Sequence, residues 1–273
     1  MPLYITSLNS GSNGNCYYVG NEQEAVLIDA GLSCRQTEVR MQRLGLSLQT
    51  VKAIFISHEH SDHISGLAQL SAKYQIPVYI TALTLRSTRL LPARFPLRVL
   101  TTYEPVAVGA LRITAFPKQH DAVDPHSFLV EDEVTRVGVF TDIGTACEHV
   151  THHFGQCHAV FLEANYDEDL LENGRYPAFL KQRIRGDQGH LSNQQALALL
   201  VAHKPPFMSH VLLSHLSKDN NSPVVARDLF LPHMNQTQLI VASRFAETPV
   251  YTVRAIEPDA KAELVGNVPA FAG

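Results

Sequence analysis

A short apolar run that leads directly into a cluster of metal-binding side chains is the feature that most constrains this sequence. Residues 51–56 have the composition of a buried strand, and the six residues after Ser57 contain four metal ligands: His58, His60, Asp62 and His63. Imidazole and carboxylate groups bind zinc, manganese or iron. A solvated, histidine-rich loop is the alternative, but four such ligands rarely follow a buried strand by chance.

The spacing of these ligands predicts two metal ions. In an extended segment His58 and His60 face the same side, whereas Asp62 and His63 turn towards a second point where a helix begins. Two-metal hydrolases hold their ions about 3.5–4 Å apart, a separation that one short loop can serve.

The rest of the chain alternates between strand and helix patterns. Strands are predicted at residues 25–28, 51–56, 78–80, 160–163, 211–214, 239–242 and 250–253, and hairpins at 106–116 and 128–140. Helices are predicted at residues 33–44, 64–74, 192–203 and 224–231. This order favours one domain over residues 1–273, with two packed sheets covered by helices.

The composition of the chain indicates a folded protein without a membrane-spanning segment. A hydrophobic content of 45% excludes a disordered chain, and a net charge of −4 means that a nucleic-acid partner needs a local basic patch. No stretch is apolar and long enough to span a membrane, and the first residues do not resemble a signal peptide. The four cysteines show no CxxC spacing, so we expect reduced thiols in a cytoplasmic protein.

The HxHxDH segment after a strand resembles the metallo-β-lactamase superfamily, which implies an α/β fold: a four-layer αββα sandwich of two mixed sheets flanked by helices. Other positions also match the superfamily pattern: Asp29 at the end of an earlier strand, and then His120, Asp142 and His215 after later strands. The resemblance implies that Asp29 supports the metal loop without binding metal. His126 is an alternative to His120 as the third histidine ligand. Asp142 could instead be a turn residue, and His215 could be a core histidine.

This ligand set leads to a hypothesis of two divalent ions, zinc or manganese, with iron also compatible. One ion would be held by His58, His60 and His120, and the other by Asp62, His63 and His215. Asp142 would bridge them, and a metal-activated water would attack the substrate. Asp62 therefore counts as both a ligand and a catalytic residue.

Two further motifs resemble ribonuclease Z. Glu163 lies in a Leu-Glu-Ala-Asn segment, and His190 in a Gly-His-Leu-Ser segment before an alanine-rich helix. The resemblance implies that Glu163 orients His190 and that His190 protonates a leaving oxygen. The alternative for His190 is a helix-entry residue next to Ser192, which has the residue type of a helix cap.

Residues 10–15, 58–63, 187–193 and 215–221 together resemble the YycJ/WalJ group, with Tyr166 as a departure from its usual pattern. Members are regarded as 5′-to-3′ DNA exonucleases, which implies a nucleic-acid substrate, with DNA favoured. A ribonuclease Z-like RNase, or a small-molecule ester or thioester hydrolase of the same fold, is the alternative. The sequence lacks a Gly/Pro-rich arm for tRNA, which disfavours a true ribonuclease Z.

Candidate substrate-binding residues come from the first and last of these segments: Ser10, Ser12, Asn13, Asn15, Lys218 and Asn220. Small residues expose N–H and hydroxyl groups that can hold a phosphate, although a plain turn would look the same. Two basic clusters could follow a nucleic-acid backbone or be solvated helix faces: Arg86, Arg89, Arg94 and Arg98, and Arg175, Lys181, Arg183 and Arg185. In the second cluster, Tyr176 and Phe179 could stack on a base, but core packing is the favoured interpretation.

Overall fold

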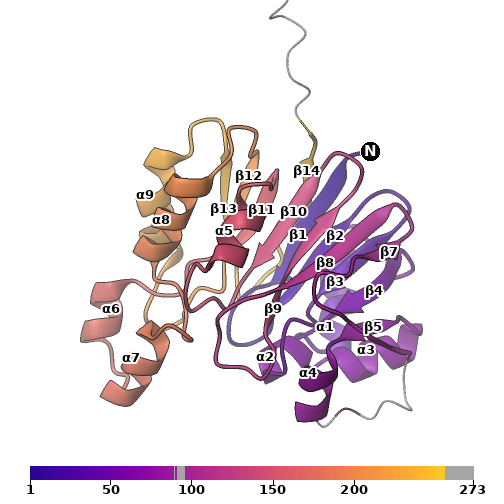
Figure 1. The fold of residues 1–273 in the computed structure, drawn as a ribbon, viewed down its shortest axis with the longest axis horizontal. Helices are drawn as coiled ribbons and strands as arrows, with labels where there is room; N and C mark the ends of the chain where they lie inside the picture. The colour runs from indigo at the N-terminus through magenta and orange to yellow at the C-terminus, as the bar shows by residue number, and fades with distance from the viewer. Residues whose placement is uncertain (89, 91–95, 256–273) are drawn as a thin grey trace, which may run out of the picture.

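Two seven-stranded sheets lie face to face in the computed structural model, which describes residues 1–88, 90 and 96–255 (Figure 1). The first sheet has the order β14 (Tyr251–Val253), β1 (Leu3–Asn9), β2 (Cys16–Gly20), β3 (Ala25–Ile28), β4 (Val51–Phe55), β5 (Val78–Ile80) and β6 (Leu97–Val99). The second has the order β13 (Gln238–Val241), β12 (His210–Ser214), β11 (Ala159–Glu163), β10 (Arg136–Phe140), β9 (His126–Glu131), β8 (Leu111–Pro117) and β7 (Val106–Val108).

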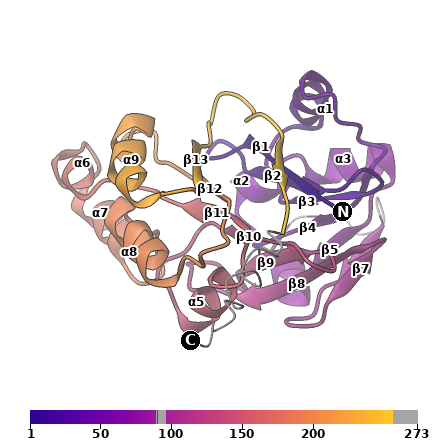
Figure 2. The same ribbon diagram turned by 90° about the horizontal axis from the view of Figure 1, so that it is seen from above.

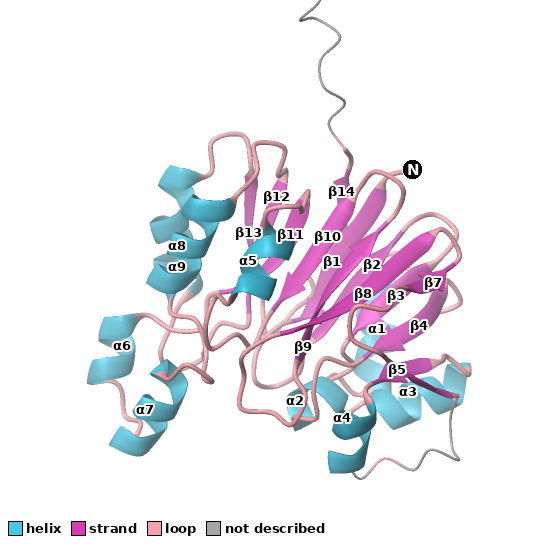
Figure 3. Ribbon diagram, viewed as in Figure 1, coloured by secondary structure: helices cyan, strands magenta, loops and turns pink. Residues whose placement is uncertain are grey.

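Helices cover the outer faces of both sheets, as the view from above shows (Figure 2). The first sheet is flanked by α1 (Cys34–Arg43), α2 (Ser61–Ile64), α3 (Leu67–Tyr74) and α4 (Ala82–Ser87). The second is flanked by α5 (Glu148–Phe154), α8 (Asn193–His203) and α9 (Pro223–Phe230), which continues into η2 (Leu231–His233). The short helices α6 (Glu168–Asn173) and α7 (Ala178–Arg185) project beyond the end of the second sheet (Figure 3).

Both sheets are mixed, and each has one antiparallel and one parallel half. Strands β3 to β6 and β10 to β13 run parallel to their neighbours. Parallel strands are buried on both faces, which explains the continuous apolar runs of β3 and β11, where every residue is buried. The carboxyl ends of these strands lie at one edge of the sandwich, where ligands bind in such sheets.

Three apolar cores hold the four layers together. The central core lies between the sheets and contains Phe55, Phe128 and Phe161. A second core joins the second sheet to α5, α8 and α9, and a third joins the first sheet to α1 and α3. The predicted αββα architecture is therefore confirmed, while a single domain over residues 1–273 extends beyond the described residues and stays a prediction.

The ends of the described chain meet in the first sheet. Strand β14 pairs with β1 in antiparallel register, with Leu3 opposite Val253. The strand at 250–253 was predicted, but β1 and β2 were not, because β1 carries buried polar residues such as Thr6 and Ser7 that blur its pattern. All four cysteines are free, and none of the described helices has the length and apolar character needed to cross a membrane.

Replacing Phe128 by Ala removes a ring that is fully buried between the sheets. This ring packs edge-on against the Phe55 ring, with 5.9 Å between the ring centroids. We expect Phe128→Ala to lower the free energy of unfolding by about 3–5 kcal/mol, measured by urea denaturation. Phe179→Ala is the matched control, because that ring is 72% exposed, and a change within about 0.5 kcal/mol is expected. Equal losses from both variants would contradict the placement of the central core.

Candidate metal centre

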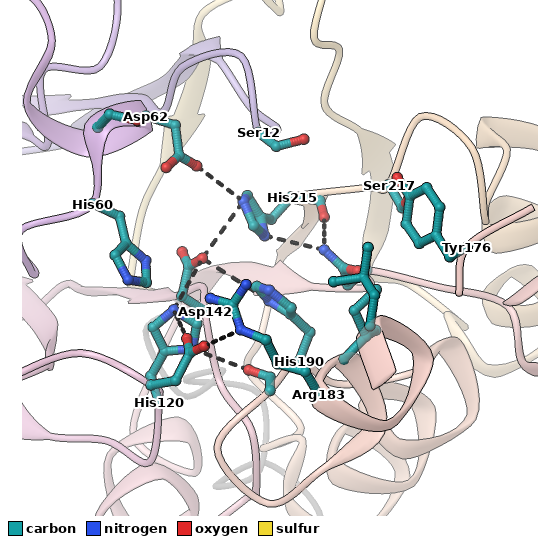
Figure 4. A pocket seen from close by; sticks show the side chains of 16 residues that line it. Ser12, His60, Asp62, His120, Asp142, Tyr176, Arg183, His190, His215 and Ser217 are labelled. Atoms are coloured by element: carbon teal, nitrogen blue, oxygen red, sulfur yellow. Dashed lines mark hydrogen bonds and ion pairs between the residues drawn. The ribbon is translucent and has the colours of Figure 1, made fainter. Parts of the chain in front are cut away.

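The predicted ligands gather at the edge of the sandwich where the carboxyl ends of several strands meet. Figure 4 shows those that line the cavity: His60, Asp62, His120, Asp142 and His215. Strand β4 leads into the loop with His58 and His60, and α2 carries Asp62 and His63. The remaining ligands follow three strands of the second sheet: His120 after β8, Asp142 after β10 and His215 after β12. Residues up to 157 positions apart in the sequence (215 − 58) thus share one site.

The potential ligand atoms form two groups. The first triad is His58, His60 and His120, and the second triad is Asp62, His63 and His215; within each, the atoms lie within 4.8 Å of one another. Asp142 stands between the triads, with Oδ2 3.3 Å from His63 Nε2 and Oδ1 3.5 Å from His215 Nε2 and 3.8 Å from His120 Nε2. This is the arrangement that the two-ion hypothesis requires, and its occupation by metal stays a prediction.

Three buried polar atoms in this cluster have no hydrogen-bond partner among the described residues: His120 Nε2, Asp142 Oδ2 and His215 Nε2. Leaving a buried polar atom unsatisfied costs about 1–3 kcal/mol. In addition, His58 Nε2 and His60 Nδ1 face each other at 3.0 Å. A divalent cation in each triad would satisfy all of these atoms, so the residues fit the predicted metals.

Hydrogen bonds behind the histidines aim their ligand atoms inwards. His63 Nδ1 donates to Asp29 at 2.7 Å, and His215 Nδ1 donates to Glu163 at 2.9 Å. His120 Nδ1 donates to the carbonyl oxygen of Gly189 at 3.0 Å. Each bond fixes a proton on Nδ1 and aims Nε2 at the centre, as in known metal sites. Asp29 thus lies behind His63 and not among the ligand atoms.

Left-handed backbone conformations turn three of these residues into the site. Asp29, Asp142 and His215 have φ values of 62°, 55° and 57°, and each lies within two residues of the end of a strand. Such conformations are uncommon outside glycine and persist where the surrounding structure enforces them, often at functional sites. The turn at each strand end redirects the side chain from the sheet into the shared cluster.

The β3–α1 loop holds the metal loop through its backbone. The Ala30 N–H donates to the carbonyl of His63, and the Gly66 N–H donates to the carbonyl of Ala30. Gly31 allows this contact, because a Cβ there would lie 1.7 Å from the carbonyl oxygen of Asp62. Only glycine therefore permits the approach that positions Asp62 and His63.

Carboxylates give the second triad a negative environment. Burial alone would lower the pKa of the two imidazoles, but Asp142 and neighbouring carboxylates outweigh it. They raise the pKa of His215 to about 10 and that of His63 well above its usual value. Burial would conversely raise the pKa of Asp142, but His215 and His63 hold it well below its ordinary range.

The first triad behaves in the opposite way. Burial lowers the pKa of His120 to about 4, and burial together with the neighbouring His63 lowers the pKa of His58 well below its usual value. These two imidazoles are therefore neutral at pH 7 and ready to bind a cation. The two triads differ in whether metal must displace protons.

Glu163 and His190 are brought together beside the second triad. Glu163 Oε1 accepts from His190 Nδ1 at 2.8 Å and from His215 Nδ1 at 2.9 Å, while Oε2 accepts from the Ile143 N–H at 2.7 Å. Burial would raise the pKa of this carboxyl, but His190 and the hydrogen bonds hold it at about 2. The contact to His215 was missed in the sequence, because no local motif links residues 163 and 215.

His126, the competitor of His120, uses both ring nitrogens elsewhere. One contacts Thr102 Oγ1 at 2.8 Å and the other contacts the carbonyl oxygen of Asp124 at 2.9 Å. The structure therefore places His120, not His126, in the first triad.

The N-terminal loop lies behind and beside the ligands. Asn15 is buried, and its amide nitrogen lies 3.1 Å from both Asp62 Oδ2 and His63 Nε2. Ser10 is also buried, and its hydroxyl accepts from the His215 N–H at 2.7 Å. Both residues position ligands through these contacts, a role that composition alone did not indicate.

The other predicted substrate residues are spread over the rim. Ser12 lines the cavity over the metal centre, whereas exposed Asn13 donates to the carbonyl of Arg244. Asn220 is buried, Lys218 is exposed, and neither lines this cavity. Phosphate binding by the six predicted residues stays a prediction.

The aromatic residues before and within α7 differ in their surroundings. Core packing was the favoured interpretation for both, and for Phe179 it is wrong, since the ring is 72% exposed. Tyr176 lines the cavity beside the metal centre. In the other basic cluster, Arg89 and Arg94 lie outside the described residues.

Three comparisons with known proteins bear on this site. Residues 24–216 match the model of the beta-lactamase superfamily domain. The chain is 31% identical over 261 residues to exodeoxyribonuclease YycJ of Bacillus anthracis, covering 94% of this chain and 97% of that protein. It is 29% identical over 245 residues to exodeoxyribonuclease WalJ of Streptococcus pneumoniae, covering 87% and 90%.

The chain belongs to the metallo-β-lactamase superfamily. It is a metal-dependent hydrolase related to named exodeoxyribonucleases. Its fold resembles that of the metallo-β-lactamase fold protein YhfI from Bacillus subtilis, with a TM-score of 0.72 over 92% of this chain and all of that chain, at 14% identity.

Metal binding to the metal-free protein is expected to release protons, because His63 and His215 have raised pKa values and are protonated at pH 7. Apparent affinity should therefore rise with pH. Calorimetric titration with Zn²⁺ or Mn²⁺ in two buffers of different ionisation enthalpy measures the proton count. Heats that do not depend on the buffer would contradict this assignment.

Proposed function

We propose that this hydrolase is a two-metal phosphodiesterase that removes nucleotides from the 5′ end of DNA. The observation that carries the proposal is the hydrogen bond between Glu163 and His190 beside the second triad. An ester with a good leaving group needs no proton donor there, whereas an alkoxide leaving from phosphorus does. The full-length similarity to two exodeoxyribonucleases supports DNA as the substrate.

The first and second triads would hold two divalent ions, zinc or manganese, with Asp142 between them. When bound, such ions lower the pKa of water and stabilise negative charge on the phosphate oxygens. The residues themselves supply orientation: the carboxylates behind His63 and His215 fix their Nε2 atoms, and Asn15 holds Asp62.

His190 supplies the proton for the leaving group. Its Nδ1 donates to Glu163, so Nε2 is the atom that gives a proton to the departing 3′-oxygen. The P–O3′ bond breaks as the bond from phosphorus to the water oxygen forms. The His190 side chain is 21% exposed and lines the cavity, so it can reach a substrate there.

His190→Ala should lower kcat on DNA by about 10²-fold or more, the usual size of general-acid catalysis. Hydrolysis of bis(4-nitrophenyl) phosphate should change little, because nitrophenolate leaves without a proton. His152→Ala is the matched control, since His152 is an exposed histidine outside the cavity. A similar loss on both substrates would rule out the leaving-group role.

Asp62→Ala should abolish hydrolysis of both substrates and reduce the metal content, because Asp62 belongs to the second triad. Elemental analysis of the purified variant and steady-state rates measure these effects. Full activity with unchanged metal content would overturn the two-metal scheme.

The substrate is tested with metal-free protein given Zn²⁺ or Mn²⁺ and then end-labelled single-stranded DNA, double-stranded DNA, RNA or a thioester. Loss of label from the 5′ end of DNA is the expected result. Cleavage of RNA alone would indicate a ribonuclease, and activity only on the thioester would refute a phosphodiesterase.

A further inference from the structure

Helix α7 has no buried residue, although it lies beside the metal centre. A helix of a globular protein normally buries its apolar stripe against a core. In α7 the apolar residues Leu180 and Ile184 instead line the cavity over the metal centre, which has a volume of about 370 Å³. This size is within the range of small-ligand sites, so α7 forms a cavity wall.

Tyr176 extends this apolar wall. Its hydroxyl donates to Asp219 Oδ2 at 3.1 Å, which holds the ring at the cavity. The wall faces the metal ligands and His190 (Figure 4). An aromatic ring with two aliphatic side chains provides a surface for a base and sugar, because stacking on an aromatic face tolerates every base.

Arg183 adds a cation to the same wall. Its Nε donates to Asp121, and Asp121 Oδ1 lies 3.4 Å from His120 Nε2. The arginine side chain is 60% exposed, and its two Nη groups donate to no residue in the described part of the chain. The guanidinium fork matches phosphate geometry, and the ion pair with Asp121 keeps it next to the first triad.

The other basic residues of the cluster point elsewhere. Arg185 pairs with Glu172 and lines a separate cavity with Tyr166. Lys181 donates to the carbonyl of Glu172. Of the four cationic residues in this cluster, Arg183 is the one that lines the metal cavity.

We propose that Tyr176, Leu180 and Ile184 hold the nucleoside next to the scissile bond, and that Arg183 binds a non-bridging oxygen of the scissile phosphate. This inference rests on the proposed function and names the residues that would recognise its substrate.

Arg183→Ala is compared with Arg185→Ala in the metal-loaded enzyme. Both variants remove one arginine from the same exposed helix, but only Arg183 lines the metal cavity. With a 5′-labelled single-stranded DNA, we expect Arg183→Ala to lower kcat/KM about 10- to 100-fold, as for a lost charged hydrogen bond. Arg185→Ala should stay within about twofold, and Arg183→Lys should recover part of the loss, because its ammonium keeps the charge without the fork.

Salt dependence separates a phosphate contact from a structural effect. Removing one contact to single-stranded DNA should reduce the slope of log(kcat/KM) against log[salt] by about 0.7. The slope should fall for Arg183→Ala and not for Arg185→Ala. Thermal unfolding and metal content, measured on each variant, should match the parent protein.

Tyr176→Ala tests the apolar wall. It should raise KM for DNA and change kcat at saturating DNA much less, because the ring binds the nucleoside and does not contact the reacting atoms. If the parent enzyme cleaves DNA while Arg183→Ala retains its rate and salt slope, the inference about α7 is wrong and the proposed function stands. If the parent enzyme cleaves no nucleic acid and binds no phosphorothioate oligonucleotide, both are wrong.

Discussion

The buried hydrogen bonds between carboxylates and imidazoles are the interaction on which the metal centre depends. Asp29 and Glu163 are both fully buried, and each holds the Nδ1 side of an imidazole in the second triad. Burying a carboxylate without partners is very costly. Both accept several hydrogen bonds: Asp29 from Ser57 and His63, and Glu163 from two histidines and two backbone N–H groups. The network therefore fixes the geometry before any cation binds.

Glu163 links the second triad to His190, the proposed proton donor. Its Oε1 contacts both His215 of the second triad and His190 in the cavity wall. Positive charge on one imidazole is thus felt by the carboxylate that orients the other, and a cation near His215 changes the environment of His190. A single buried side chain can in this way link metal binding to leaving-group protonation.

The sequence predicted the architecture because the strands that carry the ligands are buried on both faces. The runs before Asp29, His58, Asp142 and His215 are mainly apolar, and each of these residues lies within three residues of the end of its strand. Strands β1 and β2 were missed; in β1 the buried hydroxyl of Thr6 is satisfied by Thr248, which is distant in sequence. Contacts of this kind have no local signature.

Residues that position the ligands were missed for the same reason, because their contacts join segments that are distant in sequence. A motif identified the Glu163–His190 pair, but Asn15 touching Asp62, or Ser10 accepting from His215, depends on how a loop at the start of the chain meets strands that follow much later. The role of α7 could not be predicted from its sequence either, because its basic and apolar residues fit a solvated face as well as a binding surface. Only the position of the helix beside the ligands distinguishes them.

The cavity has two walls that come from different parts of the fold: one carries the predicted metal ligands, and the other carries the residues proposed to bind the substrate. The metal ligands emerge from strand ends that three apolar cores hold in place, whereas Tyr176 and α7 belong to a projection that buries little apolar surface. When the ligands lie on a rigid scaffold and the recognition residues lie on a separate segment, the same ligands can serve many substrates. Since the scaffold alone fits an ester, a thioester or a phosphodiester, substrate choice has to come from residues outside the two triads. In the proposed scheme, Glu163 and His190 select the leaving group and Arg183 selects the charge that the cavity accepts.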